Sequence, residues 1–358
     1  MKVRHVCDLP PKEDNPRNSE GAFLRSPSGE ILFAYSSYLG EDGNDHAACN
    51  ISLIRSYDEG ESWTETPEVI ARASEFGTKN VMSVSALTLL DGSPAFFYLI
   101  KEPNGTTTLG RSVSCDGGRS FTQERVNWDA PSAYYVINND RLVRTSDGRI
   151  VAPASYYPPL DPKRHLFNPG VAVLLISDDD GATFSLHDGV RISFSESVNV
   201  GYGMQEPGIL ELSKDVFWMW MRTGAGYQYE SFSVDGLRSF SPPRPSQFTS
   251  PDSPMQVVRY DENTLYVIYN PIPNYNGRNK GYSWGRTPLV IRKSTDNGKT
   301  FSWQSIIEES EGDRGFCYPG VFFTNDGSML IGYCRGDESD GCCLFRLGIV
   351  KIKLTEIR

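Results

Sequence analysis

One short pattern recurs five times along the chain, and it constrains the fold more than any other feature. The pattern is Ser-x-Asp-x-Gly-x-x-aromatic, and in the fourth copy the glycine comes one residue early. The copies occupy residues 56–63, 114–121, 177–184, 233–240 and 294–301, so each begins 56 to 63 residues after the one before. Such near-constant spacing is typical of a repeat architecture in which each repeat is one supersecondary unit.

The chemistry of this pattern is structural. An Asp two residues before a Gly folds back onto backbone N–H groups, and the Gly supplies a positive φ. The aromatic residue then packs beneath the turn. We therefore expect these aspartates to hold hairpins together and not to take part in catalysis.

A second repeat lies between these copies. Alternating apolar runs are interrupted by tight turns at residues 28–29, 91–92, 147–148, 214–215, 262–263 and 326–327. Each turn precedes a strand-like run, such as residues 31–35, 216–220 or 329–333. Each unit therefore contains four antiparallel strands.

Six such units of about 60 residues account for the whole chain of 358 residues. We predict an all-β protein, a single six-bladed β-propeller domain over residues 1–358. The sixth unit lacks the repeated pattern, so we expect residues 342–352 to complete it and a strand near residues 3–6 to close it. A β-sandwich with linkers fits the spacing poorly.

Composition excludes several classes of protein. The net charge of −10 argues against a nucleic-acid partner, which requires a basic face. The sequence has no run of 18 apolar residues, so we expect no membrane-spanning helix. It also has no apolar core near its start, so we expect no signal peptide. We expect a cytoplasmic protein, or a secreted one if a leader has been removed.

Cysteine and histidine usage gives no sign of a cofactor. The seven cysteines are scattered without a CxxC pair, which favours reduced thiols. The four histidines are widely spaced, which argues against a zinc site. We expect no metal and no cofactor, and the sequence does not indicate an oligomeric state.

The order of turns predicts which end of the propeller carries the site. The tight turns and the repeated Asp turns fall at one end, so we look for chemistry at the other. The first strands begin there with Glu20, Ser83, Asn139, Glu206, a position near Pro254, and Tyr318. The second strands and later loops add Asp45, Arg222, Tyr227, Tyr229 and Arg286. Carboxylates, arginines and tyrosines that converge in this way are typical of a ligand site.

The repeated turns resemble the Asp-boxes of the sialidase (neuraminidase) superfamily, and the resemblance covers essentially the whole chain. In that family a glutamate at a strand head precedes a carboxylate-binding arginine by sixteen residues, as Glu206 precedes Arg222 here. The family's nucleophilic tyrosine stands nine residues before the glycine of the last hairpin, and Tyr318 stands nine before Gly327.

Two further positions resemble the family's site. Arg286 is similar in place to a second substrate-binding arginine, and Asp45 resembles the acid/base aspartate before the third strand of the first unit. The resemblance implies a retaining exo-glycosidase that removes a terminal sialic acid or a related acidic sugar. Tyr318 would be the nucleophile and Glu206 its base, while Asp45 would protonate the leaving oxygen. We expect Asn139, Tyr227 and Tyr229 to contact the sugar.

One position departs from the family pattern. Where sialidases have the first of three clamping arginines, this chain has Glu20, and Arg25 lies five residues too far along the strand to replace it. Like charges about 4 Å apart repel by about 4 kcal/mol at an effective dielectric of about 20. We therefore expect weak activity on ordinary sialosides, unless Glu20 is protonated or paired with Arg222 or Arg286.

Other interpretations remain open. The protein could be a glycan-binding propeller without activity, or a hydrolase or lyase for another sugar such as a uronic-acid glycan. Glu206 and Arg222 could form a structural pair, and Asp45 could be an ordinary turn residue. The combination of Tyr318 with a base favours an enzyme, because a binding module needs no nucleophile.

Overall fold

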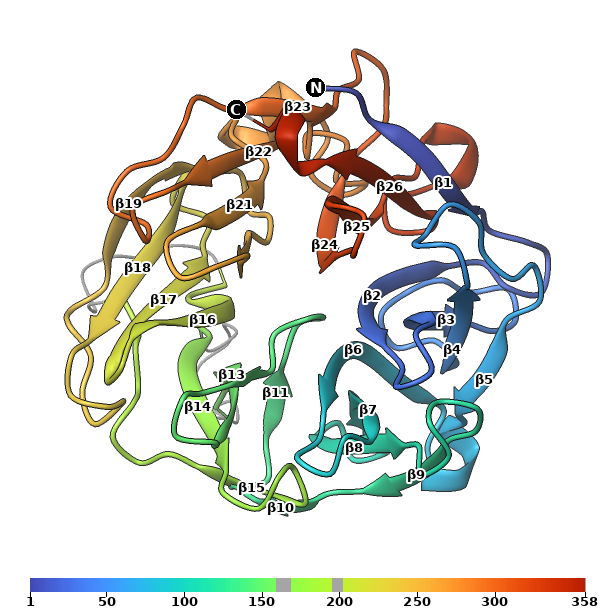
Figure 1. The fold of residues 1–358 in the computed structure, drawn as a ribbon, viewed down its shortest axis with the longest axis horizontal. Helices are drawn as coiled ribbons and strands as arrows, with labels where there is room; N and C mark the ends of the chain where they lie inside the picture. Colours follow the sequence, from blue (N-terminus) through green and yellow to red (C-terminus); the bar gives the residue numbers. More distant parts are fainter. Residues whose placement is uncertain (159–168, 195–201, 358) are drawn as a thin grey trace, which may run out of the picture.

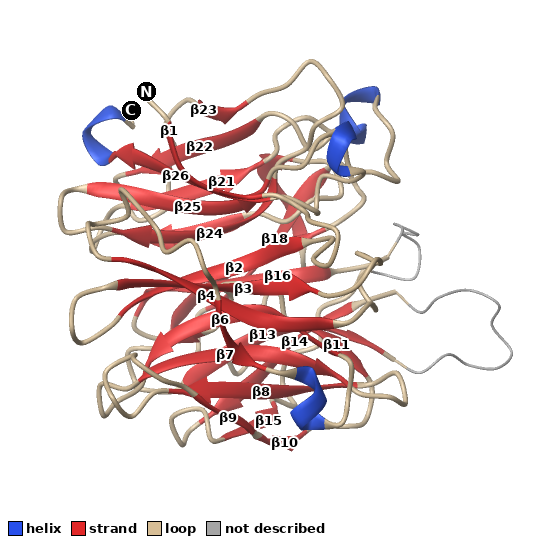
Figure 2. Cartoon of the chain, turned by 90° about the vertical axis from the view of Figure 1, so that its right-hand side faces the viewer, coloured by secondary structure: helices blue, strands red, loops and turns tan. Residues whose placement is uncertain are grey.

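The computed structural model describes residues 1–158, 169–194 and 202–357 as an all-β protein. Its sheets stand side by side in a ring around a central axis, an arrangement typical of a propeller (Figure 1). Seen from the side, the strands cross the molecule and loops gather at its two ends (Figure 2). Within the described ranges no helix has the length and apolar character needed to cross a bilayer. The short 3-10 helices are η1 (Ala73–Phe76), η2 (Asn274–Gly277), η3 (Glu338–Asp340) and η4 (Leu354–Glu356).

The largest sheet holds the first third of the chain. Its strands are β2 (Asn18–Arg25), β3 (Ile31–Tyr38), β4 (Cys49–Ser56), β5 (Glu68–Ala71), β6 (Asn80–Thr88), β7 (Pro94–Lys101), β8 (Thr107–Val113) and β9 (Thr122–Arg125). It consists of two consecutive antiparallel meanders, β2 to β5 and β6 to β9. A single parallel pair, Cys49 with Asn80, joins them.

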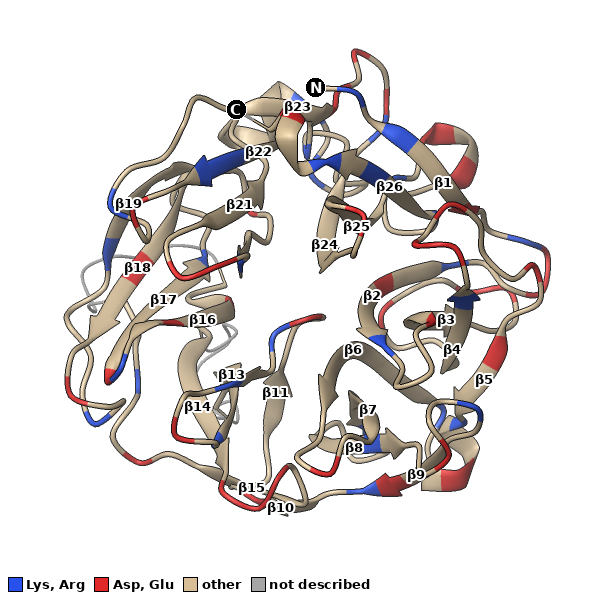
Figure 3. Cartoon of the chain, in the orientation of Figure 1, with Lys and Arg blue, Asp and Glu red and all other residues tan. Residues whose placement is uncertain are grey.

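The next two sheets follow in chain order around the ring. One contains β10 (Asn127–Asp129), β11 (Tyr134–Val136), β12 (Val143–Arg144), β13 (Ile150–Tyr157), β14 (Val171–Ser177) and β15 (Thr183–Leu186). The other contains β16 (Gln205–Ser213), β17 (Val216–Arg222), β18 (Tyr227–Ser233) and β19 (Arg244–Thr249). Between β11 and β12 the chain reaches toward the axis, and charged residues of both signs lie on this segment (Figures 1 and 3). The segment contains the half-buried Asp140 and the buried Arg141.

The last two sheets complete the ring. One contains β20 (Gln256–Arg259), β21 (Leu265–Tyr269), β22 (Leu289–Ser294) and β23 (Ser305–Glu308). The other combines β24 (Cys317–Phe323), β25 (Ser328–Cys334) and β26 (Leu347–Lys353) with the N-terminal β1 (Arg4–Leu9). β1 pairs antiparallel with β26, as expected for the strand that closes the ring. Buried apolar clusters fill the spaces between neighbouring sheets.

The repeated Asp turns have the geometry that their sequence predicts. In the first copy the Ser56 hydroxyl donates to Asp58 at 2.9 Å and accepts from the Gly60 amide at 2.8 Å, while Asp58 accepts from the Ser62 amide at 2.9 Å. The other four copies repeat the Ser–Asp contact at 2.8 or 2.9 Å. In the fourth copy the early glycine shifts the amide contact to Leu237, which takes a φ of 74°.

A second repeated feature shapes the opposite end of the ring. Near the start of their first strands, Glu20, Ser83, Glu206 and Tyr318 all adopt a positive φ between 43° and 59°, and each lies where the pairing register shifts. A left-handed conformation costs a non-glycine residue roughly 1–2 kcal/mol. Backbone strain of this kind tends to collect at functional sites. In the third unit the equivalent residue is Asp140 (φ 56°), so the position assigned to Asn139 was wrong by one residue.

Candidate active site

A cavity of about 680 Å³ opens at the end of the ring away from the Asp turns. Six of the ionisable residues predicted from the sequence line it: Glu20, Asp45, Glu206, Arg222, Arg286 and Tyr318. They come from the starts of β2, β16 and β24, the end of β17, and the loops before β4 and β22. Residues up to 298 positions apart in the sequence therefore meet in one place.

Tyr318, Glu206 and Arg222 form one hydrogen-bonded group. The Tyr318 hydroxyl donates to Glu206 Oε1 at 2.9 Å, and Arg222 Nη1 donates to the same oxygen at 2.8 Å and to the Tyr318 oxygen at 3.1 Å. Burial and the Glu206 charge raise the pKa of Tyr318 well above its ordinary value, although both site arginines oppose that shift. Tyr318 is therefore a neutral phenol, and it can become a nucleophile only by giving its proton to a neighbouring base.

Asp252 fixes the other side of Arg222. Its carboxylate accepts from Arg222 Nε at 2.6 Å and from Gln205 at 3.0 Å, and Lys280 lies 3.4 Å away. Burial opposes ionisation, but Arg222 keeps the pKa of Asp252 at about 2. Asp252 is not among the predicted site residues, although it lies two positions before Pro254, near the predicted head of the fifth first strand.

Arg286 is held by a loop that packs unusually closely. A Cβ on Gly285 would lie 1.8 Å from the carbonyl oxygen of Tyr275, so only glycine fits before Arg286. The guanidinium donates to the Asp252 carbonyl at 3.1 Å and to Cys317 Sγ at 3.2 Å, and it lies 5.5 Å from the centre of the Tyr318 ring. Both arginines therefore approach the nucleophile candidate.

Glu20 is paired with an arginine that the sequence pattern does not predict. Its Oε1 accepts from Arg17 Nη2 at 3.0 Å and its Oε2 accepts from the Ser83 hydroxyl. Glu20 therefore pairs with Arg17, whose side chain is 1% exposed, and not with Arg222 or Arg286, the two partners that the sequence left open. Burial raises the pKa of Glu20, and the Arg17 charge limits that rise. Arg17 lies three residues before the predicted strand head at Glu20, so the spacing from the tight turn does not point to it.

Asp45 shares the same arginine. Arg17 Nη1 donates to Asp45 Oδ1 at 2.6 Å, and Lys101 donates to the Asp45 carbonyl. The charge of Arg17 lowers the pKa of Asp45 to about 2, so this carboxylate is ionised at neutral pH. Its side chain is 59% exposed, in contrast to the buried Glu20.

Three predicted contact residues lie outside the cavity lining. Tyr229 packs on Phe194 with ring centres 4.9 Å apart, and Tyr227 is 41% exposed at the start of β18. Asn139 is buried and donates to the carbonyl oxygens of Gly21 (2.9 Å) and Tyr318 (3.3 Å), so it links two strand heads. The aromatic and basic wall is formed instead by Lys101, Tyr134, Tyr157 and Tyr202.

Two buried polar atoms at the site have no protein partner. They are Glu206 Oε2 and Arg286 Nε, one an acceptor and the other a donor. Buried polar atoms are normally paired, so orphans beside a cavity indicate groups that a ligand can satisfy. Among the described residues, no cluster of three His, Cys, Asp or Glu side chains is arranged to hold a metal ion.

The family model for the BNR repeat-like domain matches residues 29–331, which is most of the chain. The chain belongs to this family. Its propeller is that of the sialidase/BNR-repeat superfamily. No curated protein sequence matches the chain.

Solved structures share the fold at low sequence identity. A protein of unknown function from Dyadobacter fermentans is 21% identical, with a TM-score of 0.71 and 99% of each chain covered. The Hadza microbial sialidase Hz136 is 16% identical, with a TM-score of 0.73, and 96% of this chain covers 66% of that one. The intramolecular trans-sialidase from Ruminococcus gnavus is 12% identical, with a TM-score of 0.70 over 99% of this chain and 98% of that one.

Proposed function

We propose that this BNR-family protein is a retaining, sialidase-like exo-glycoside hydrolase that removes a terminal sialic acid or a related acidic sugar from glycans. The contact of Tyr318 with Glu206 and Arg222 carries this proposal, because it combines a nucleophile, its base and a carboxylate-binding cation.

We also propose that the propeller has six blades. The largest sheet contains two four-stranded meanders that share only one bridge pair, so we count it as two blades.

The chemistry follows from these contacts. Arg222 and Arg286 hold the sugar carboxylate by charge-assisted hydrogen bonds. The Tyr318 oxygen attacks the anomeric carbon while its proton moves to Glu206, and the bond to the leaving oxygen breaks. A neutral phenol suits this role, because a carboxylate nucleophile would be repelled by the acidic sugar. Water then cleaves the glycosyl-tyrosine bond and restores both side chains.

Asp45 serves best in the second step. An ionised carboxylate can accept a proton from the attacking water, which matches the low pKa that Arg17 imposes. In the first step Asp45 must carry a proton to the leaving oxygen. A bound glycan that excludes water and separates Asp45 from Arg17 would raise its pKa enough for that purpose.

The ion pair with Arg17 changes how strongly Glu20 repels an acidic substrate. A lone Glu20 would repel a neighbouring carboxylate, but Arg17 at 3.0 Å offsets part of its charge, although Arg17 also binds Asp45. We propose that acidic sugars bind through two arginines, and that the Glu20–Ser83 side of the cavity accepts hydroxyl or amino groups. Ordinary sialosides are therefore poor but real substrates.

A second candidate is a lyase for uronic-acid glycans. The Tyr318 oxygen lies 3.1 Å from Arg222 Nη1, a placement that also suits removal of the proton next to a bound carboxylate. In that reaction Glu206 takes the phenol proton, the Tyr318 oxygen then removes the C5 proton, the C4–oxygen bond breaks as a C4–C5 double bond forms, and the leaving oxygen takes a proton from water, with no covalent intermediate.

Product analysis separates these candidates. Purified protein is incubated with aryl sialosides, natural sialylated glycans and uronic-acid oligosaccharides. A retaining hydrolase releases free sugar whose first-formed anomer matches the substrate, as NMR can follow. A lyase instead gives an unsaturated product that absorbs in the ultraviolet. Binding without turnover of any of these substrates would support the glycan-binding alternative and reject both enzymes.

A further inference from the structure

Three buried thiols meet directly behind the candidate nucleophile. Cys317 precedes Tyr318 on β24. Cys334, on the neighbouring strand β25, lies opposite Cys317, and Cys343 lies in the loop before β26. The sulfur atoms of Cys317 and Cys343 are 3.7 Å apart, and all three cysteines are fully buried with Trp284 and Tyr318. The proposed mechanism uses none of these thiols.

The two site arginines differ in how their charges are balanced. Arg222 has two carboxylate partners, Glu206 at 2.8 Å and Asp252 at 2.6 Å. Arg286 is 4% exposed, yet within the described ranges no carboxylate lies within 4 Å of it. Its hydrogen-bond acceptors there are the Asp252 carbonyl and Cys317 Sγ. A buried charge without a counterion is expensive, so the Cys317 sulfur is the group placed to balance it.

We propose that Cys317 is a thiolate and that it is the counterion which holds Arg286 in position for the substrate carboxylate. Sγ accepts from Arg286 Nη1 at 3.2 Å, and as a thiolate it would also accept from the S–H group of Cys343, whose sulfur is 3.7 Å away. Burial by itself raises the pKa of Cys317. The hydrogen bonds from Cys334 and Cys343 and the charge of Arg286 outweigh burial, so the pKa lies well below the ordinary value.

A thiolate counterion binds the Arg286 guanidinium differently from a carboxylate. It occupies one Nη of Arg286 and leaves Nε without a protein partner. The guanidinium is therefore fixed in direction but still has a donor for a ligand. Cys317 is thus a positioning residue for Arg286, a role that rests on the proposed binding of an acidic sugar.

The charge on Cys317 can be measured without any substrate. Thiolates absorb in the ultraviolet where thiols do not, and the measurement is made near pH 6, below the pKa of about 7 that the Cys343 contact gives Cys342. We expect the folded wild type to lose about one thiolate equivalent of absorbance on unfolding in denaturant at that pH. Cys317→Ser abolishes this change, whereas the control Cys7→Ser, on β1, retains it.

Equal absorbance in wild type and Cys317→Ser would overturn the proposal. If Cys317→Ser does not fold, the unfolding experiment on the wild type still decides, because no loss of thiolate absorbance would show that Cys317 is neutral.

Kinetics then test the positioning role. We expect Cys317→Ser to raise KM for an acidic sugar substrate about 3- to 30-fold and to change kcat less than about threefold. The same substitution leaves KM unchanged for the neutral amide of that sugar. A loss of kcat that is equal for both substrates would overturn positioning of Arg286. If the protein turns over neither substrate, the proposed function fails while the absorbance result stands.

Discussion

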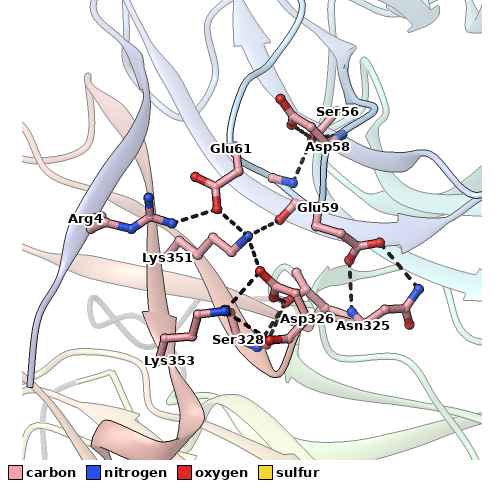
Figure 4. Close-up of polar contacts among 12 residues, drawn as sticks. Arg4, Ser56, Asp58, Glu59, Glu61, Asn325, Asp326, Ser328, Lys351 and Lys353 are labelled. Atoms are coloured by element: carbon pink, nitrogen blue, oxygen red, sulfur yellow. Dashed lines mark hydrogen bonds and ion pairs between the residues drawn. The ribbon is translucent and has the colours of Figure 1, made fainter.

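Two charge networks lie at opposite ends of the ring, and they differ in burial and in how fully their groups are paired. At the ring closure, Lys351 Nζ contacts the Glu59 carbonyl, Glu61 and Asp326 at 2.7 to 2.9 Å, and Arg4 and Lys353 neutralise the same carboxylates (Figure 4). Its carboxylates are 33% and 43% exposed.

The cavity network of Glu206, Arg222, Arg286 and Tyr318 is more deeply buried, and it keeps an acceptor and a donor unpaired. Satisfied charges at the closure hold β1 and β26 to the first Asp turn and stabilise the ring. In the proposed function, the unpaired groups at the cavity are the ones that a ligand meets.

Removal of the Tyr318 hydroxyl gives the largest expected effect. Tyr318→Phe removes the atom that forms the covalent bond but keeps the ring, so turnover falls by about three orders of magnitude or more while the melting temperature stays near that of wild type. The control Tyr266→Phe alters a buried tyrosine on β21 and should retain activity. Full activity of Tyr318→Phe would refute the nucleophile assignment.

Asp45→Asn should depend on the leaving group. Proton transfer of this kind contributes typically about 10²- to 10⁴-fold, so turnover of natural glycans falls by that amount. Activated aryl glycosides need less protonation and lose less. The comparison of kcat for the two substrate types is the measurement, and an equal loss on both would exclude Asp45 as the proton donor.

At the closure, Lys351→Met should affect stability and leave the chemistry intact. The substitution leaves Glu61 and Asp326 without a buried cation, and we expect a loss of about 1–3 kcal/mol in the free energy of unfolding, less than for a fully buried pair because both carboxylates are partly exposed. Lys353→Met is the matched control, since this exposed lysine contacts the same Asp326 and should cost less than about 1 kcal/mol. Denaturant titration measures the free energy of unfolding of both variants. If the folded variants differ in kcat, the closure network affects the chemistry at the cavity, which would contradict the distinction between the two networks.

Acid should lower the free energy of unfolding by less than the Lys351→Met substitution does. Hydrogen bonds from Arg4 and Lys351 lower the pKa of Glu61 to about 2, below its ordinary value of about 4.3. The folded state therefore binds this proton less readily than the unfolded chain, and the stabilisation is lost as pH falls from about 4.5 toward 2. Because Glu61 is partly exposed, we expect less than about 1 kcal/mol. Urea titrations over this range should give a flatter pH dependence for Lys351→Met than for wild type.

The regular repeats explain why much of the fold could be predicted. Each Asp turn is a local structure whose residues satisfy one another, so its geometry follows from the sequence pattern alone. Tyr318 and Glu206 were found by counting back from tight turns, which works where strands are regular. It failed at Asn139 because β12 is only two residues long and the chain there leaves the strand pattern.

Partners that depend on side-chain reach could not be predicted. Arg17 stands before the strand head and reaches Glu20 and Asp45 through its long side chain. Asp252 precedes a strand whose turn is irregular in sequence. Tyr227 and Tyr229 follow β17, the strand that ends at Arg222, as the sequence predicts. Tyr229 packs on Phe194, however, and neither tyrosine lines the cavity.

The most direct test of the central claim is to trap the covalent intermediate. A fluorinated acidic-sugar fluoride forms the glycosyl-enzyme but slows its hydrolysis, so the adduct accumulates and can be located by mass spectrometry of peptides. The account predicts one added sugar per chain, attached to the Tyr318 oxygen and absent from Tyr318→Phe. An adduct on another residue, or turnover of the reagent without any adduct, would contradict it.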